Sequence, residues 1–108
     1  NPSISDIKIS KEIGVDCVEL HTGHFSNLVK SKKNYSHELI KIKRSSILAT
    51  KLRIEVHAGH GLDYKTTQLL STIKEIKEFN IGHFIIGESI FFGLKKVIKN
   101  FKKIIRNY

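Results

Sequence analysis

The stretch that decides the fold spans residues 53–64 and reads RIEVHAGHGLDY. It begins with alternating apolar and polar residues, which is typical of a strand, and continues through a histidine between two glycines into a helical pattern. In β/α proteins, catalytic side chains lie at strand ends and helix N-termini bind anions. This stretch is therefore the first candidate for a functional site.

The same pattern occurs earlier in the chain. Residues 18–24 read VELHTGH and residues 54–60 read IEVHAGH, so that Glu, His, Gly and His recur at matching positions. The spacing between the two copies is about one strand-helix unit of a barrel in which eight units occupy ~250 residues. The repeat therefore indicates equivalent β/α units.

The periodicity of apolar residues predicts an alternation of strands and helices. Strands are predicted at residues 17–21, 53–57 and 81–86. Helices are predicted at residues 3–13, 35 to about 50, 63 or 64 to 76, and about 93 to 108, with a polar loop after the first strand. One helix followed by three strand-helix units favours a parallel sheet covered by helices. We expect residues 1–108 to form a single partial α/β domain, the last three units of an eight-stranded barrel.

Side chains alternate along the first two predicted strands. Val18 and Leu20 point to one face of the sheet, whereas Glu19 and His21 point to the other. In the second copy, Ile54 and Val56 likewise lie opposite Glu55 and His57. In a barrel the apolar set faces the helices and the Glu/His set lines the interior, where charged groups must pair or form a site. In an open sheet with one solvated face, the same alternation would carry no functional meaning.

The composition limits the class of protein. The chain of 108 residues is 40% hydrophobic, which is enough for one modest domain. It begins at Asn1 and contains no methionine, so we expect a piece of a longer protein. No apolar run reaches the ~18 residues of a membrane span, so no membrane association is expected. A single cysteine, Cys17, excludes an intrachain disulfide and favours a cytoplasmic location.

The net charge of +9 is concentrated near the C-terminus. Residues 95–108 carry basic side chains and no acidic ones, opposite apolar residues at helical spacing. The favoured interpretation is the solvated face of a packed terminal helix. Binding to nucleic acid or to anionic lipid is the alternative, and no nucleic-acid partner is predicted.

The residues that could carry chemistry lie around the strand ends. His60, between Gly59 and Gly61, could give or take a proton at cellular pH, although a loop histidine can also serve only its own backbone. Gly61 and Gly87 each follow a predicted strand and could donate backbone N–H groups to phosphate. A metal site is the third interpretation, built from imidazoles and carboxylates: Glu19, His21, His24, Glu55, His57 and His60.

Three segments, VELHTGHF, EVHAGHGLDY and FNIGHFIIGESIFFGL, resemble the pyridoxine 5′-phosphate synthase family. The resemblance runs through the whole chain and corresponds to somewhat under half of a family member. It implies a (β/α)8 TIM barrel, an oligomer, and no metal or organic cofactor. The implied reaction condenses 1-deoxy-D-xylulose 5-phosphate with 3-amino-2-oxopropyl phosphate, and yields pyridoxine 5′-phosphate, phosphate and water.

The resemblance also implies roles for individual residues. His60 matches the proton donor and Gly61 a substrate-binding glycine, while Glu19 matches a glutamate of the active-site region. Gly82 and His83 match a pair that contacts 3-amino-2-oxopropyl phosphate. Gly59 and Gly87 are candidates for a phosphate cradle.

The family's other acid/base residues, a histidine and a glutamate, lie in the part that this chain does not match. We therefore expect the chain alone to be inactive. Two alternatives remain open at this stage: a non-catalytic fragment that self-associates through open strand edges, and a metal-dependent barrel enzyme that uses the His/Glu set.

Overall fold

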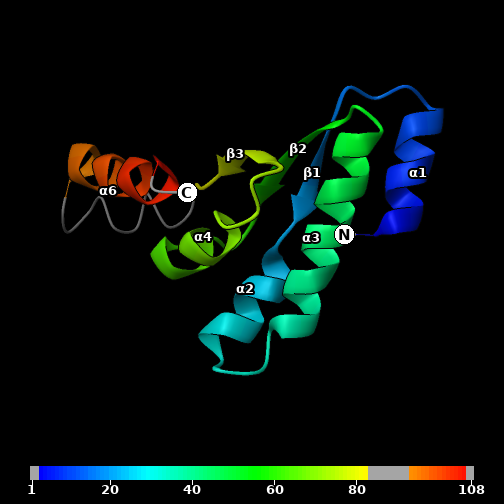
Figure 1. Ribbon diagram of the computed structural model, residues 1–108. Helices are drawn as coiled ribbons and strands as arrows, with labels where there is room; N and C mark the ends of the chain where they lie inside the picture. Colours follow the sequence, from blue (N-terminus) through cyan, green and yellow to red (C-terminus); the bar gives the residue numbers. More distant parts are fainter. Residues whose placement is uncertain (1–2, 83–92, 107–108) are drawn as a thin grey trace.

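The computed structural model describes residues 3–82 and 93–106, and these form an α/β fold (Figure 1). The elements in chain order are α1 (Ile4–Glu12), β1 (Cys17–His21), α2 (Gly23–Lys30), α3 (Ser36–Lys51), β2 (Glu55–Gly59), α4 (Tyr64–Leu70), β3 (Ile76–Asn80) and α6 (Leu94–Arg106). The α/β class and the alternation of strands with helices are confirmed.

The three described strands form one parallel sheet in the order β1-β2-β3. His21 lies opposite Gly59, and Gly59 lies opposite Asn80, so the last residues of all three strands are in register. Because parallel strands bring their carboxyl ends to one edge, the loops that follow them also start at that edge.

One face of the sheet contributes to the hydrophobic core. Leu20, Val56 and Ala58 are buried there with Ile42 and Ala49 of α3. Figure 1 shows α3 running alongside β1 and β2, with α1 packed against its outer side. This apolar packing fixes the direction in which the alternate side chains of each strand point.

The other face carries the polar side chains, as the alternation predicts. Glu19, His21 and Glu55 are exposed on it, and His57 is half-buried. The predicted division of the strands into an apolar and a Glu/His face is therefore confirmed.

The helix after β2 begins at the predicted position. Asp63 is the N-cap of α4: its carboxylate accepts from the Thr66 N–H at 2.9 Å, and the Thr66 hydroxyl accepts from the Asp63 N–H at 2.8 Å. This reciprocal capping box satisfies two backbone donors that the first helical turn leaves free. It fixes the far end of the loop that contains His60.

The prediction of a polar loop after the first strand is wrong, because α2 begins directly at Gly23. Phe25 and Val29 are four residues apart and both are buried, so they form one face of a short helix. Phe25 also meets Tyr35 edge-on, with ring centroids 5.6 Å apart. Tertiary packing of these side chains outweighs the polar composition of the segment.

The third strand lies earlier than predicted. The prediction was residues 81–86, whereas β3 spans Ile76–Asn80, Ile81 and Gly82 follow it, and residues 83–86 lie outside the described residues. Correspondingly, α4 ends at Leu70 and does not reach residue 76. The Ser71 hydroxyl donates to the Thr67 carbonyl at 2.7 Å, and Ile76 is already paired with β2.

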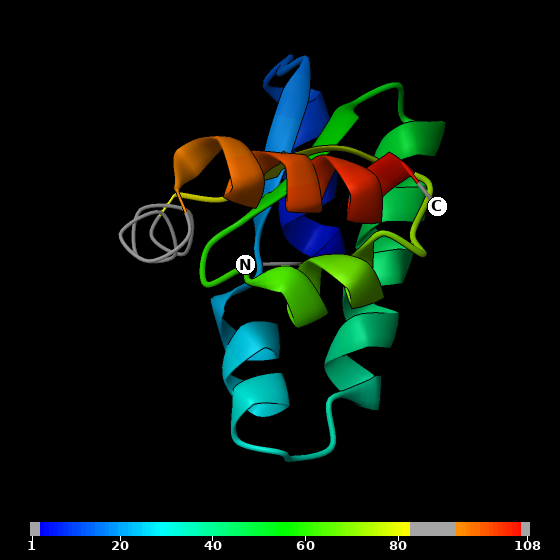
Figure 2. The ribbon, with the colours of Figure 1, turned by 90° about the vertical axis from the view of Figure 1, so that its left-hand side faces the viewer.

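The basic terminal helix α6 packs on α4, as Figure 2 also shows. Val97 and Phe101 are buried, and the Phe101 ring lies 4.6 Å from that of Tyr64. The lysines of α6 are exposed, as predicted, but Leu94 and Ile105 of the expected apolar face are exposed too. None of the described helices combines the length and apolar character needed to cross a bilayer.

Candidate functional site at the carboxyl ends of the strands

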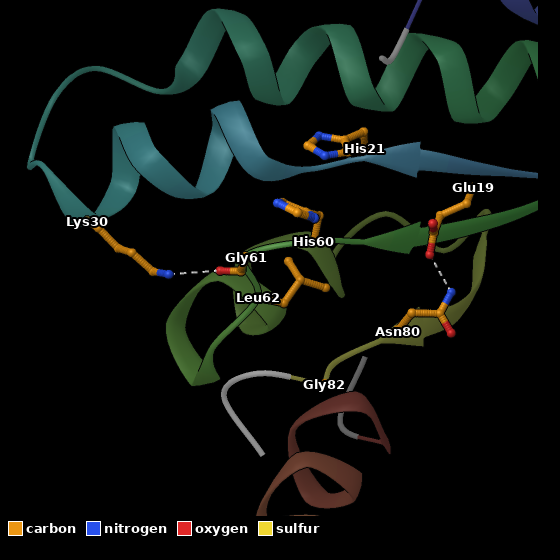
Figure 3. Close-up of a pocket in the computed structure, with 8 residues that line it drawn as sticks. All are labelled: Glu19, His21, Lys30, His60, Gly61, Leu62, Asn80 and Gly82. Carbon is orange, nitrogen blue, oxygen red and sulfur yellow. Dashed lines mark hydrogen bonds between the residues drawn. The ribbon is translucent and has the colours of Figure 1, made fainter. Parts of the chain in front are cut away.

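A pocket of about 450 Å³ opens at the carboxyl ends of the three strands (Figure 3). It is lined by Glu19, His21, Lys30, His60, Gly61, Leu62, Asn80 and Gly82. The strand ends and the loops after β1, β2 and β3 thus contribute to one site. The pocket lies at the end of β2, where the sequence offered its first candidate residues.

His60 is held in an unusual backbone conformation in the loop after β2. Its φ is +92°, which an L-residue adopts only when its surroundings enforce it. Buried Thr22 supplies part of that constraint: its hydroxyl lies 2.8 Å from the Gly59 carbonyl and 2.9 Å from the His60 carbonyl. The Thr22 N–H also donates to Gly59 at 2.9 Å. The loop after β1 therefore positions the histidine of the next loop.

The ring of His60 stacks on the ring of His21. The centroids are 4.2 Å apart and the planes are inclined by 28°. The Gly23 N–H donates to Nδ1 of His21 at 3.3 Å, which places the proton of a neutral His21 on Nε2. The two imidazoles from equivalent strand ends thus form one unit beside the pocket.

Gly23 permits this stack because it has no side chain. A Cβ at this position would lie 2.7 Å from Cε1 of His21 and 2.9 Å from Cδ2 of His60. Contacts this short cannot exist, so any larger residue would push the rings away. Gly61 is similarly restricted: its φ is +74°, and an added Cβ would lie 3.1 Å from Cβ of Ser26.

Glu19 reaches across Gly59 to the third strand. Its carboxylate accepts from the Asn80 side-chain amide at 2.6 Å. A Cβ on Gly59 would overlap this carboxylate and would approach Cβ of Asn80 to 3.1 Å. The role of Gly59 at this edge is therefore steric: it leaves the space in which the Glu19–Asn80 pair forms.

A second polar cluster lies within strands β2 and β3, before their carboxyl ends. His57 Nε2 is 2.7 Å from a Glu55 oxygen and 3.5 Å from a Glu78 oxygen. The metal interpretation grouped four histidines that the structure separates. His21 and His60 form the stack, His57 belongs to the second cluster, and His24 is exposed on α2. Throughout residues 3–82 and 93–106, no three His, Cys, Asp or Glu side chains converge to hold a metal ion.

The predicted site residues are only partly brought together. Glu19, His60, Gly61 and Gly82 line the pocket, and Gly59 lies directly beneath the Glu19–Asn80 pair. His83 and Gly87 lie outside the described residues.

Four residues of the pocket lining are not among the predicted site residues: His21, Lys30, Leu62 and Asn80. The sequence placed His21 on the polar Glu/His face and in the metal interpretation, but it gave no indication of the stack with His60. Lys30 was assigned to a loop, and Asn80 was not recognised as a strand end. A better placement of β3 would have indicated Asn80, because it is the residue in register with Gly59.

Comparison with known proteins gives a consistent match along the chain. The model of the family described as pyridoxal phosphate biosynthesis protein PdxJ matches residues 1–107. A protein of Pelagibacter ubique named pyridoxine 5′-phosphate synthase is 65% identical over 104 residues, which are 96% of this chain and 44% of that protein.

More distant relatives carry the same name. The Zymomonas mobilis protein is 43% identical over 104 residues, covering 96% of this chain and 40% of the relative. The Sulfurihydrogenibium protein is 41% identical over 107 residues, covering 99% of this chain and 43% of the relative. The chain thus spans less than half the length of the curated relatives it matches, and by the match of its sequence it belongs to the PdxJ family of pyridoxal phosphate biosynthesis proteins.

Proposed function

We propose that this chain supplies one wall of the active site of a pyridoxine 5′-phosphate synthase. The complete enzyme would condense 1-deoxy-D-xylulose 5-phosphate with 3-amino-2-oxopropyl phosphate, a transferase reaction that releases phosphate and water. The observation that carries the proposal is the His21–His60 stack beside the Glu19–Asn80 pair in one pocket. Membership of the family and the names of the relatives support it.

The geometry suits repeated proton transfer. Ring closure requires imine formation, enolisation, loss of phosphate and dehydration, and every one of these steps moves a proton. His60 is exposed to the pocket and its backbone is fixed by Thr22, so its ring can deliver a proton to a departing oxygen. Glu19, oriented by Asn80, can stabilise positive charge that develops on nitrogen.

Glycines give the substrate access to backbone groups. Gly61 and Gly82 line the pocket, and with His83 they are proposed to contact 3-amino-2-oxopropyl phosphate. Gly59 and Gly87 are proposed to complete a phosphate cradle. No metal or organic cofactor has a part in this mechanism.

The wider assembly follows from the same proposal. The parallel sheet and its flanking helices would form three β/α units of a TIM barrel, with the remaining strands supplied by a longer chain. The Glu/His face of the sheet would then line the barrel interior. A cytoplasmic homo-oligomer is proposed for the complete enzyme.

A hybrid protein tests the proposal directly. The matching segment of the Pelagibacter ubique relative would be replaced by this chain, and the purified hybrid assayed for pyridoxine 5′-phosphate and for released phosphate. We expect turnover that depends on both phosphorylated substrates. A folded hybrid that forms no product, beside an active unmodified relative, would contradict the proposed function.

A further inference from the structure

Lys30 is placed at the pocket by a contact between distant parts of the chain. It is the last residue of α2, and its Nζ donates to the Gly61 carbonyl in the loop after β2 at 3.0 Å. Figure 3 shows the side chain extended toward Gly61, on the same side of the site as His60. A lysine on an exposed helix end has many other conformations, so this contact defines where the ammonium group lies.

The charge of Lys30 distinguishes it from the other residues of the pocket. Among the described residues that line the pocket, it alone carries a permanent positive charge. Glu19, the one carboxylate among the described lining residues, is engaged by Asn80. A dianionic phosphate that enters the pocket would therefore meet the ammonium group of Lys30, which forms no ion pair with Glu19 in the described part of the chain.

The hydrogen-bonding capacity of the ammonium group is not exhausted by Gly61. An ammonium group has three N–H donors, and the Gly61 carbonyl accepts one of them. A structural role at the C-terminus of α2 is the alternative, because a cation there stabilises the helix dipole. That role does not require the ammonium group to reach a loop of the neighbouring unit.

On this basis we infer that Lys30 binds the phosphate group of 3-amino-2-oxopropyl phosphate, with the Gly61 carbonyl holding the ammonium group beside His60. This inference rests on the proposed function for the identity of the substrate, and on the geometry of the pocket for the anion site. Gly61 and Gly82 are proposed to contact the same substrate, which is why Lys30 is assigned to it and not to deoxyxylulose phosphate.

The anion site can be tested on the hybrid protein with inorganic phosphate as the probe. Imidazole signals of His21 and His60 would be followed by NMR during the titration. We expect Lys30→Gln to need about tenfold more phosphate for the same shift, the loss typical of one charge-assisted hydrogen bond. Lys30→Arg should bind phosphate nearly as well as the unmodified hybrid. The matched control is Lys33→Gln, which removes the same charge from an exposed position outside the pocket lining. Equal titrations of the unmodified hybrid and its Lys30→Gln variant would overturn the inference.

The substrate is assigned with the hybrid enzyme. Lys30→Gln should raise KM for 3-amino-2-oxopropyl phosphate by about tenfold, while KM for deoxyxylulose phosphate and kcat stay within about twofold. A rise confined to KM for deoxyxylulose phosphate would overturn the assignment. A folded hybrid that forms no product but still shows Lys30-dependent phosphate binding would contradict the proposed function and not the anion site.

Discussion

The rings of His21 and His60 lie 4.2 Å apart although they belong to different strand-loop units. Both belong to the internal repeat, but they are not equivalent positions in it. His21 is the last residue of β1, whereas His60 lies one residue beyond the end of β2. The positive φ of His60 turns its ring back over the first unit. The stack is therefore a product of the loop conformation and not of the repeat itself.

His60→Asn in the hybrid enzyme should reduce kcat by about 10²–10⁴-fold, because that is the usual contribution of one general acid. KM should change little, since asparagine retains a polar side chain of similar reach. Steady-state kinetics with both substrates would measure the two parameters separately. The matched control is His24→Asn, which changes an exposed histidine of α2 outside the pocket lining. Retention of kcat within a few fold in His60→Asn would rule out the proton-donor role.

Gly23→Ala should separate the two imidazoles. The added methyl group would lie within 3 Å of both rings, which must therefore rotate or shift. We expect kcat of the hybrid to fall at least about tenfold, with a modest loss of stability, because the clashing atoms belong to movable side chains. Thermal unfolding and kinetics on the same sample would distinguish the two effects.

The control for that substitution is Gly14→Ala, which adds the same methyl group away from the stack. Unlike Gly23, Gly14 has a positive φ, +81°, but no heavy atom lies within 4 Å of its added Cβ. Its replacement should cost about 1 kcal/mol of stability and leave kcat unchanged. Equal losses of activity in both variants would mean that general destabilisation, and not the stack, explains the result.

Asn80→Ala should impair catalysis through Glu19. Without the amide, the Glu19 carboxylate loses a 2.6 Å hydrogen bond and the orientation that it provides. The expected result is a decrease of about 10- to 100-fold in kcat, typical of the loss of a residue that orients a catalytic group. Asn27→Ala, at an exposed position of α2, is the control.

Rescue by a second amide would separate positioning from mere packing. Asn80→Gln should recover part of the kcat lost in Asn80→Ala, because its amide can still donate to Glu19. If Asn80→Gln were as impaired as Asn80→Ala while the fold stayed intact, orientation of Glu19 would not be the cause.

The sequence could predict the β2 end of the site because that segment combines local signals. Alternation places Val56 and Ala58 in the core, Gly59 and Gly61 flank His60 where the strand ends, and Asp63 caps the next helix, all within one short stretch. These signals depend on nearest neighbours along the chain, so reading them requires no knowledge of the sheet.

The remaining parts of the site depend on contacts between distant residues. Asn80 ends a strand whose Lys77 and Glu78 are exposed, so the apolar run after it was the stronger strand signal. Lys30 enters the site through a contact with Gly61, and α2 is stabilised by burial of Phe25. Neither effect can be read from local periodicity, because tertiary packing decides both.

The edges of the sheet lead to a prediction for the chain on its own. Among residues 3–82 and 93–106, β1 and β3 each pair on one side only, with β2. Unpaired strand edges recruit other strands, in this case from further copies of the chain. The purified 108-residue chain should therefore self-associate and form no pyridoxine 5′-phosphate.

Light scattering coupled to size-exclusion chromatography, under reducing conditions, would measure the mass of the species that the chain forms in solution. Cys17→Lys places a charge at the exposed start of β1 and should reduce the association. A monomer at all concentrations, or measurable synthesis by the chain alone, would show that the edges do not behave in this way.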